Sequence, residues 1–356
     1  LPVGNRNSSA DVMGDAYEYL IKKFADMSKK NAGEFYTPRA VVKLMVQLLQ
    51  PKSGESVYDP AAGTGGMLIE AIRNMDDEKA SYGKIYGQEK NLSTSAIARM
   101  NLFLHGAKEF KIVREDTLRS PQFIHHGQLQ QFDIVLANPP YSISSWNRDA
   151  FETDQYGRNF LGVPPQGRAD YAFFQHILKS LKPGTGRCAI LFPHGVLFRG
   201  EEKDMREKLV QHDLVECVIG IGKNLFYNSP MEACIVICNT NKPAARRGKV
   251  LFINAKNEVT RKNSQSYLEE EHIAKIAGAY TDYATIDGFS VVATIDEIAA
   301  NESKLSIALY VRKTGDGEEI NIDDAIDAWK TSATTVRMEY EKLNQLIKAG
   351  ENDDAL

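Results

Sequence analysis

Apolar positions recur along this chain with two alternating periods, one typical of buried strands and one typical of helices. Short apolar runs predict strands over 56–59, 84–87, 111–113, 132–137, 187–192, 214–221, 232–238 and 249–255. Helical spacing between them predicts helices over 67–75, up to His105, near 170–181 and near 201–211. This alternation indicates an α/β fold with a doubly wound, mainly parallel sheet of seven or eight strands. The last strands follow one another without helices, so we expect an antiparallel edge.

Two helices are predicted ahead of the sheet. The first covers residues 11–30, where an apolar face is formed by Met13, Tyr17, Leu20, Phe24 and Met27. The second starts with Thr37 as N-cap and Pro38 as its first residue, and it runs to Gln50. Because the chain begins with Leu1 instead of Met, we expect it to be trimmed from a longer sequence.

Two regions depart from the strand–helix alternation. Residues 142–169 are rich in Gly, Pro and aromatic residues, and a loop of this length is usually either functional or disordered. Near the C-terminus, apolar residues recur at steps of four and three: Ile322, Ile326, Trp329, Ala333, Val336, Tyr340, Leu343 and Ile347. This period of 3.5 predicts a long helix that packs either on its own domain or on a helical partner.

Composition limits the classes of function. No run of about 18 apolar residues exists, so no membrane-spanning helix is predicted. The formal net charge of −4 lacks the basic excess of a dedicated nucleic-acid binder, so another chain would supply many phosphate contacts. The four cysteines lie among apolar residues. They are predicted to be buried, reduced thiols and not metal ligands, which fits a cytoplasmic protein.

A glycine-rich turn, DPAAGTGG at 59–66, joins the first predicted strand to its helix. Gly63 and Gly65 allow positive φ and close approach of a ligand to the backbone. A phosphate-binding P-loop needs a lysine that is absent here, and a dinucleotide turn needs a small residue where Leu68 stands. S-adenosylmethionine carries a sulfonium and an amino group but no phosphate. The acidic Asp59 therefore favours S-adenosylmethionine.

Acidic residues also follow the next two strands. Glu89 comes after the second strand, where a carboxylate can bind two ribose hydroxyls. Asp116 comes after the third strand and can bind an adenine amino group. Each acid alone is more often a solvated loop residue. Three acids at successive strand ends, beside the glycines, favour a cofactor site instead.

The fourth strand ends in Asn138, Pro139, Pro140 and Tyr141. An adenine amino group is a poor nucleophile because its lone pair is delocalised into the ring. Two acceptors on its N–H bonds favour a tetrahedral nitrogen and stabilise the positive charge that develops during methyl transfer. The Asn138 oxygen and the Pro139 carbonyl, directed by the prolines, can be these acceptors, and the Tyr141 ring can stack on a base. The alternative is a simple strand-ending turn, for which Asn-Pro is common.

Eight motifs stand in a fixed order along the chain. They are GEFYTPRAVV (33–42), DPAAGTGGMLIEA (59–71), YGQEK (86–90), EDTL (115–118), NPPYS (138–142), RADYAFFQHIL (168–178), LFPHGVLF (191–198) and LFYNSPMEACIVI (225–237). This set resembles the modification (methylase) subunit of type I restriction–modification systems, an adenine-N6 DNA methyltransferase. The resemblance implies the fold of S-adenosylmethionine-dependent methyltransferases and covers nearly the whole chain.

The resemblance also implies residue roles. Catalysis is assigned to Asn138, Pro139, Pro140 and Tyr141. The cofactor is bound by Phe35, Tyr36, Thr37, Pro38, Asp59, Gly63, Thr64, Gly65, Glu89, Asp116 and Asn138. The substrate pocket is lined by Tyr141, Asp170 and Phe173, and no metal is implied.

A larger assembly is implied as well. Residues 1–32 are interpreted as a helix linked to a missing N-terminal helical domain, 33–310 as the catalytic domain, and 311–356 as a helical extension for partner binding. The partners are DNA, a specificity subunit flanked by two methylase subunits, and a restriction subunit. The target adenine leaves the duplex, and 142–169 is the candidate to close over it. Arg148, Arg158 and Arg168 are either phosphate contacts or solvated loop cations.

Two other functions remain open on the sequence alone. A protein-glutamine methyltransferase shares the NPPY motif and would place a side-chain amide where adenine is expected. A non-catalytic assembly subunit would keep the fold without the activity. The long loop and the C-terminal repeat argue against the first, and the intact motif residues argue against the second.

Overall fold

A computed structural model describes residues 37–75, 81–141, 143–226, 232–263 and 265–313. It also describes Gly14 and the residues 16–17, 19–20, 326–327, 329–334 and 336–341, all of which are helical. Contacts between residues divide the chain into two units, Leu1–Arg312 and Lys313–Leu356. The predicted boundary between 310 and 311 lies two residues from this division.

The larger unit contains thirteen strands among its described residues. They are β1 (Val57–Asp59), β2 (Ile85–Glu89), β3 (Lys111–Arg114), β4 (Ile124–His125), β5 (Gln128–Leu129), β6 (Ile134–Ala137), β7 (Arg187–Pro193), β8 (Val215–Ile221), β9 (Ala233–Asn239), β10 (Lys249–Ala255), β11 (Thr260–Lys262), β12 (Gln265–Tyr267) and β13 (Ser290–Thr294). Nine of them form one sheet in the order β13-β10-β8-β9-β7-β6-β1-β2-β3. The other four form the hairpins β4–β5 and β11–β12.

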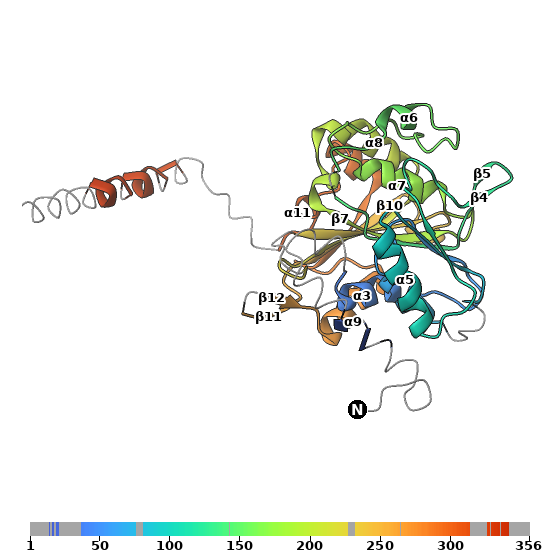
Figure 1. Cartoon of the computed structure of the whole chain (residues 1–356). Coiled ribbons are helices and arrows are strands. Elements are labelled where there is room, and N and C mark those ends of the chain that lie inside the picture. The colour runs from blue at the N-terminus through green and yellow to red at the C-terminus, as the bar shows by residue number, and fades with distance from the viewer. Residues whose placement is uncertain are drawn as a thin grey trace, which may run out of the picture. The chain divides into compact units, whose positions relative to one another are not determined.

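The helices cover both faces of the large sheet (Figure 1). They are α3 (Arg39–Leu49), α4 (Gly66–Arg73), α5 (Leu92–Leu104), α6 (Arg148–Glu152), α7 (Asp170–Lys179), α8 (Lys203–Gln211), α9 (Glu270–Asp282), α10 (Ile295–Ala300) and α11 (Ile307–Tyr310), with the short 3₁₀ turns η2 (His194–Leu197), η3 (Gly200–Glu202) and η4 (Ala244–Arg246). In one core, α3, α4, α5 and α9 pack on the sheet, and in the other α7, α8, α10 and α11 do. Alternate strand residues serve the two cores, since successive side chains of a strand point to opposite faces.

The predicted mainly parallel sheet is confirmed, with two differences in its antiparallel part. First, β9 lies inside the sheet, antiparallel to both β7 and β8, instead of at the edge. Its residues are almost all buried, as an interior strand requires. Second, β13 pairs antiparallel with β10 and forms the outer edge. This ninth strand of the sheet and α9 lie between residue 255, where the last predicted strand ended, and the predicted C-terminal helix.

The sheet order places a topological switch between β1 and β6. From β1 the chain continues outward to β2 and β3, whereas β6 leads to β7 on the other side. In open α/β sheets, ligands bind at such a switch, outside the carboxyl ends of the strands. Asp59 ends β1 and Asn138 directly follows β6, so both flank this point.

Residues 143–169 form an ordered and packed segment, not a structureless loop. It contains α6, and its side chains Phe151 and Leu161 are 1% and 0% exposed. Phe160 lies against Lys179 and His212, on the side of the sheet where its strands begin. Phe151, by contrast, packs in a small core with Leu118 and Phe173 that also contacts Ala61, at the carboxyl edge of the sheet.

The predicted terminal helices are only partly tested. Met13, Phe24 and Met27 lie outside the described residues, as do Ile322, Leu343 and Ile347. In the smaller unit, every described residue between 326 and 341 is helical, and the side chains of Ile326, Trp329, Val336 and Tyr340 are exposed. The full length of the C-terminal helix stays a prediction.

Candidate active site

A small cavity joins the glycine turn to the turn after β6. It is lined by Thr37, Val42, Asp59, Ala61, Ala62, Gly63, Thr64, Gly66, Met67 and Asn138. Its volume is about 30 Å³, which has room for about one water molecule. The predicted cofactor turn and the predicted catalytic asparagine thus face the same space. Val42, Ala62 and Met67 also line it, and as ordinary apolar residues they carried no sequence signal.

The glycines give the turn its shape. Gly63 and Gly65 have φ of 52° and 82°, in the left-handed region that other residues rarely adopt. The Gly63 amide donates to Glu89 Oε2 at 3.0 Å, which ties the turn to the end of β2. Within β2, a Cβ on Gly87 would lie 3.0 Å from Ala62 and 2.6 Å from Ile112. The absence of a side chain at Gly87 therefore allows the turn to pack against the sheet. This need for glycine at position 87 was not predicted from the sequence.

Asp59 is a buried carboxyl group beside the cavity. Its Oδ1 accepts from the Ala61 amide at 2.9 Å, and no ion pair involves it among the described residues. Burial, more than the neighbouring charge of Glu89, raises the pKa of Asp59 to about 7. Since this exceeds the unfolded value of about 4, ionisation of Asp59 lowers the stability of the fold as pH rises through about 7. A cation bound in the cavity would offset that loss.

Glu89 and Asp116 continue the acidic edge. Glu89 Oε1 accepts from the Asn91 amide at 2.8 Å, and burial raises the pKa of Glu89 above its ordinary value. Asp116 Oδ1 accepts from the Leu118 amide at 3.0 Å, and Lys90 forms an ion pair with Oδ2 at 2.8 Å. The acids at the ends of β1, β2 and β3 thus follow neighbouring strands along one edge.

The Asn138 amide is bonded at both ends. Its Nδ2 donates to Thr37 Oγ1 at 2.9 Å, and its Oδ1 accepts from the Tyr141 hydroxyl at 2.7 Å. Thr37 was predicted to cap the following helix, but the N-cap of α3 is Pro38, without a side-chain bond. The Thr37 hydroxyl instead reaches Asn138. A carbonyl oxygen has two lone pairs, so an amide oxygen can accept two hydrogen bonds.

The other predicted site residues lie in different surroundings. Phe173 packs with Leu118, Phe151 and Ala172 in a small core that also contacts Ala61 of the cofactor turn. Asp170 starts α7, is 1% exposed and pairs with Arg199 at 2.7 Å, and it is not among the residues that line the cavity. Phe35 and Tyr36 lie outside the described residues.

The model of the N-6 DNA methylase family matches residues 8–319 of this chain.

This chain belongs to the N-6 DNA methylase family.

Individual relatives agree with this assignment. The type I restriction enzyme MjaVII methylase subunit of Methanocaldococcus jannaschii is 36% identical over 352 residues, which are 95% of this chain and 59% of the relative. The HindI methylase subunit of Haemophilus influenzae is 33% identical over 85% of this chain and 68% of its own length. A type I methyltransferase subunit from Streptococcus thermophilus shares 36% identity and a TM-score of 0.78, over 87% of this chain and 65% of that one. This methylase chain spans only 57–63% of three archaeal relatives.

The three arginines of the 142–169 segment of this methylase differ in their exposure and in their bonding partners. Arg158 is neither a phosphate contact nor a solvated cation, because it is 3% exposed. It pairs with Asp154 at 2.6 Å and donates to the carbonyls of Thr117 and Leu118, both at 3.0 Å. Arg148 donates to the Pro164 carbonyl, and Arg168, 41% exposed, lies 3.6 Å from Glu201. Arg148 and Arg168 are therefore partly exposed, at 32% and 41%, and Arg158 is the buried one.

Arg158 also connects the segment to the cofactor side of the methylase. The Thr117 hydroxyl donates to the Pro60 carbonyl at 2.6 Å, and Pro60 follows Asp59. The Arg158 guanidinium therefore supports the loop that carries Asp116, and this loop in turn holds the start of the glycine turn. A buried arginine inside a loop-like segment gave no signal in the sequence.

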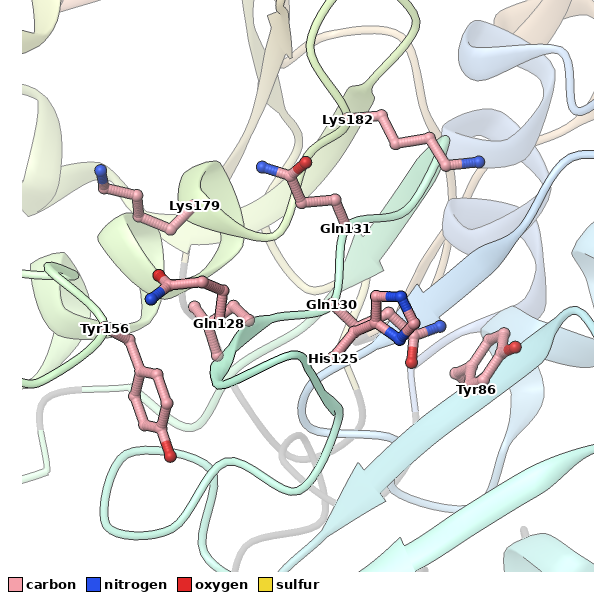
Figure 2. A pocket seen from close by; sticks show the side chains of 9 residues that line it. Tyr86, His125, Gln128, Gln130, Gln131, Tyr156, Lys179 and Lys182 are labelled. Carbon is pink, nitrogen blue, oxygen red and sulfur yellow. The ribbon is translucent and has the colours of Figure 1, made fainter.

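A larger hollow of about 810 Å³ lies elsewhere on the methylase (Figure 2). Its lining includes Tyr86 near the start of β2, Gln131 just before β6 and Lys182 just before β7. These positions are at the amino ends of the strands, opposite the edge that carries Asn138. The hollow is therefore remote from the cavity of Asp59 and Asn138, despite its size.

The cysteines of the methylase lie in its core. All four cysteines are buried and free, as predicted. No group of three or more His, Cys, Asp or Glu residues in those ranges is arranged to hold a metal ion. No helix in that part of the chain combines the length and apolar character needed to cross a membrane.

Proposed function

We propose that this chain transfers a methyl group from S-adenosylmethionine to the N6 amino group of adenine in duplex DNA. The observation that carries the proposal is the shared cavity, lined by Asp59 and the glycine turn on one side and by Asn138 on the other. A methyl donor at the turn and an amino group at Asn138 can meet only if these elements face each other. Family membership supports DNA as the substrate over the glutamine side chain of a protein.

The residues around the cavity fit the proposed cofactor. S-adenosylmethionine supplies a methyl group on a positively charged sulfur. Asp59 is a buried carboxyl group without a cationic partner among the described residues, so it suits a sulfonium or ammonium group. Gly63 and Gly65 allow close approach, Glu89 suits the ribose, and Asp116 suits the adenine.

The turn after β6 is proposed to activate the base. Asn138 Oδ1 and the Pro139 carbonyl accept hydrogen bonds from the adenine amino group and stabilise the charge that develops on nitrogen. The nitrogen lone pair forms the new bond to carbon as the carbon–sulfur bond breaks, and the amino group then loses a proton to water. Tyr141 offers a stacking face worth about 1–3 kcal/mol. That energy helps to extrude the adenine, which takes a few kcal/mol.

Direct labelling tests this proposal. The chain is combined with its cognate specificity subunit, duplex DNA and methyl-labelled S-adenosylmethionine, and the digested products are separated. We expect the label on adenine N6. Label on protein would favour the glutamine alternative, and no label with cofactor bound would favour a non-catalytic assembly subunit.

Cofactor affinity is expected to depend on pH through Asp59. Its pKa of about 7 means that the carboxyl group is largely protonated below neutrality, while a bound cation favours the ionised form. The association constant should therefore fall up to about tenfold for each pH unit below 7. Isothermal titration calorimetry between pH 5.5 and 8.5 measures this fall, together with the proton released on binding.

Asp59→Asn should bind more weakly at pH 8 and lose this dependence on pH. Glu207→Gln, which removes an exposed acid on α8, is the matched control and should retain it. If the association constant of Asp59→Asn kept the same dependence on pH, Asp59 would not be the group that binds the cation.

The smaller unit is proposed to bind the specificity subunit. Trp329, Val336 and Tyr340, spaced by seven and four residues, are 70%, 66% and 63% exposed. Such an apolar stripe on a helix suits a helical partner. The assembly proposed from the resemblance has two methylase subunits for each specificity subunit, can add a restriction subunit, and works in the cytoplasm. Recognition of the DNA sequence by another chain accounts for the absence of a basic excess, that is, for the net charge of −4.

Charge substitution tests this surface. Trp329→Asp should weaken association with the specificity subunit by at least about tenfold, because exposed aromatic residues are frequent binding hot spots. The melting temperature of the larger unit should not change. Analytical ultracentrifugation compares how the unchanged methylase and Trp329→Asp associate with the specificity subunit. Equal association would show that the stripe serves another purpose.

A further inference from the structure

Thr37 meets the catalytic turn from a segment distant in the sequence. Its hydroxyl oxygen accepts the Asn138 Nδ2 hydrogen at 2.9 Å, across 101 residues of chain. The two side chains also line the same cavity. The contact gives Thr37 a task different from capping α3 or binding the cofactor.

Both partners of this hydrogen bond are held by rigid surroundings. Thr37 precedes Pro38, which restricts its backbone to extended conformations. The helix that follows, α3, buries Val41, Leu44 and Met45 completely in the core. Asn138 follows the fully buried strand β6 and is itself 7% exposed. The position of each group is therefore set by packing that does not involve the other.

The orientation of the Asn138 amide decides whether it can accept from a base. With Nδ2 on Thr37, Oδ1 is directed toward Tyr141, the ring on which the base is proposed to stack. The opposite orientation would present N–H groups to the adenine amino group, which is also a donor. Donation from Nδ2 also polarises the amide and makes Oδ1 a stronger acceptor.

We infer that Thr37 is a positioning residue for methyl transfer, which holds the Asn138 amide with its oxygen toward the substrate. Thr37 does not contact the reacting atoms in this role, because it acts through Asn138. The inference rests on the proposed function. It gives a positioning role to Thr37, which the family resemblance assigns to cofactor binding. Without this acceptor Nδ2 loses its hydrogen bond to Thr37, and the amide is no longer held with its oxygen toward the substrate.

Single-turnover methyl transfer by Thr37→Val, at saturating cofactor and in the complex with specificity subunit and DNA, tests the inference. Valine keeps the shape but removes the acceptor, so the rate should fall about 5- to 150-fold. The dissociation constant of S-adenosylmethionine should stay within about threefold, since in this role Thr37 acts on Asn138 and not on the cofactor. Thr37→Ser, which keeps the hydroxyl, should recover most of the lost rate.

Three results would overturn the inference. One is an unchanged rate in Thr37→Val, and another is a Thr37→Ser rate as low as that of Thr37→Val. The third is a normal rate at saturation with much weaker cofactor binding, which would make Thr37 a cofactor contact. Thermal melting of each variant checks that it is folded, and the serine variant remains informative if valine disturbs the fold. Asn138→Ala in the same assay separates the two proposals, because its full activity would contradict the proposed function itself.

Discussion

Replacing Asn138 by alanine is expected to lower the single-turnover rate of methyl transfer by about 10²- to 10³-fold. The amide oxygen is one of two acceptors proposed to stabilise the positive charge on the adenine nitrogen. In the structure this oxygen is preorganised by hydrogen bonds at both ends of the amide, so alanine leaves no substitute acceptor in place. Label transfer under single-turnover conditions measures the loss.

Binding of the cofactor separates this effect from general damage. Asp59 is held by the Ala61 amide and Gly63 by Glu89, so the dissociation constant of S-adenosylmethionine should change by less than about threefold. Asn257→Ala, at an exposed asparagine after β10, is the matched control and should leave both quantities unchanged. Near-normal turnover in Asn138→Ala would eliminate the proposed chemistry.

Replacing Arg158 by methionine is expected to lower the free energy of unfolding by about 3–5 kcal/mol. The Asp154 carboxylate, 3% exposed, would then be buried without its cation. The carbonyls of Thr117 and Leu118 would also lose their donors. Chemical denaturation at pH 7 measures this change, and the looser loop around Asp116 should weaken cofactor binding as well.

Arg168→Met provides the comparison within the same segment. Its guanidinium is 41% exposed and lies 3.6 Å from Glu201, so its removal should change stability by less than about 1 kcal/mol. Equal stability of the Arg158→Met and Arg168→Met chains would show that the buried pair contributes nothing net to the fold.

The parts of the fold that were predicted correctly depend on patterns within short stretches of the sequence. The strand β6 is a run of apolar residues that the sheet buries completely, and the prolines after it end any strand. The acids after β1, β2 and β3 were expected at one edge because parallel strands share a direction. The roles of these residues remain proposals, but their placement beside one switch point follows from the alternating pattern.

The parts that were missed depend on contacts between distant segments. The sequence of β9 is typical of any buried strand and does not reveal its insertion between β7 and β8. Arg158 stands among Gly, Asn and aromatic residues, where a charged side chain is usually solvated. Its burial depends on the Thr117 and Leu118 carbonyls, about 40 residues earlier, and a local pattern cannot report them.

By itself, the sequence of this methylase determined the main alternation of strands and helices up to β10, the glycine turn, the acids at the ends of β1, β2 and β3, and the rigid Asn-Pro-Pro turn. These follow from periodicity and from the conformations that each residue permits. Only the tertiary structure decided that Thr37 would hold Asn138, that Arg158 would support the Asp116 loop, and that β9 would run against its neighbours. The physical reason is that hydrogen bonds and burial depend on which segments meet in space, and distance along the chain does not specify those meetings.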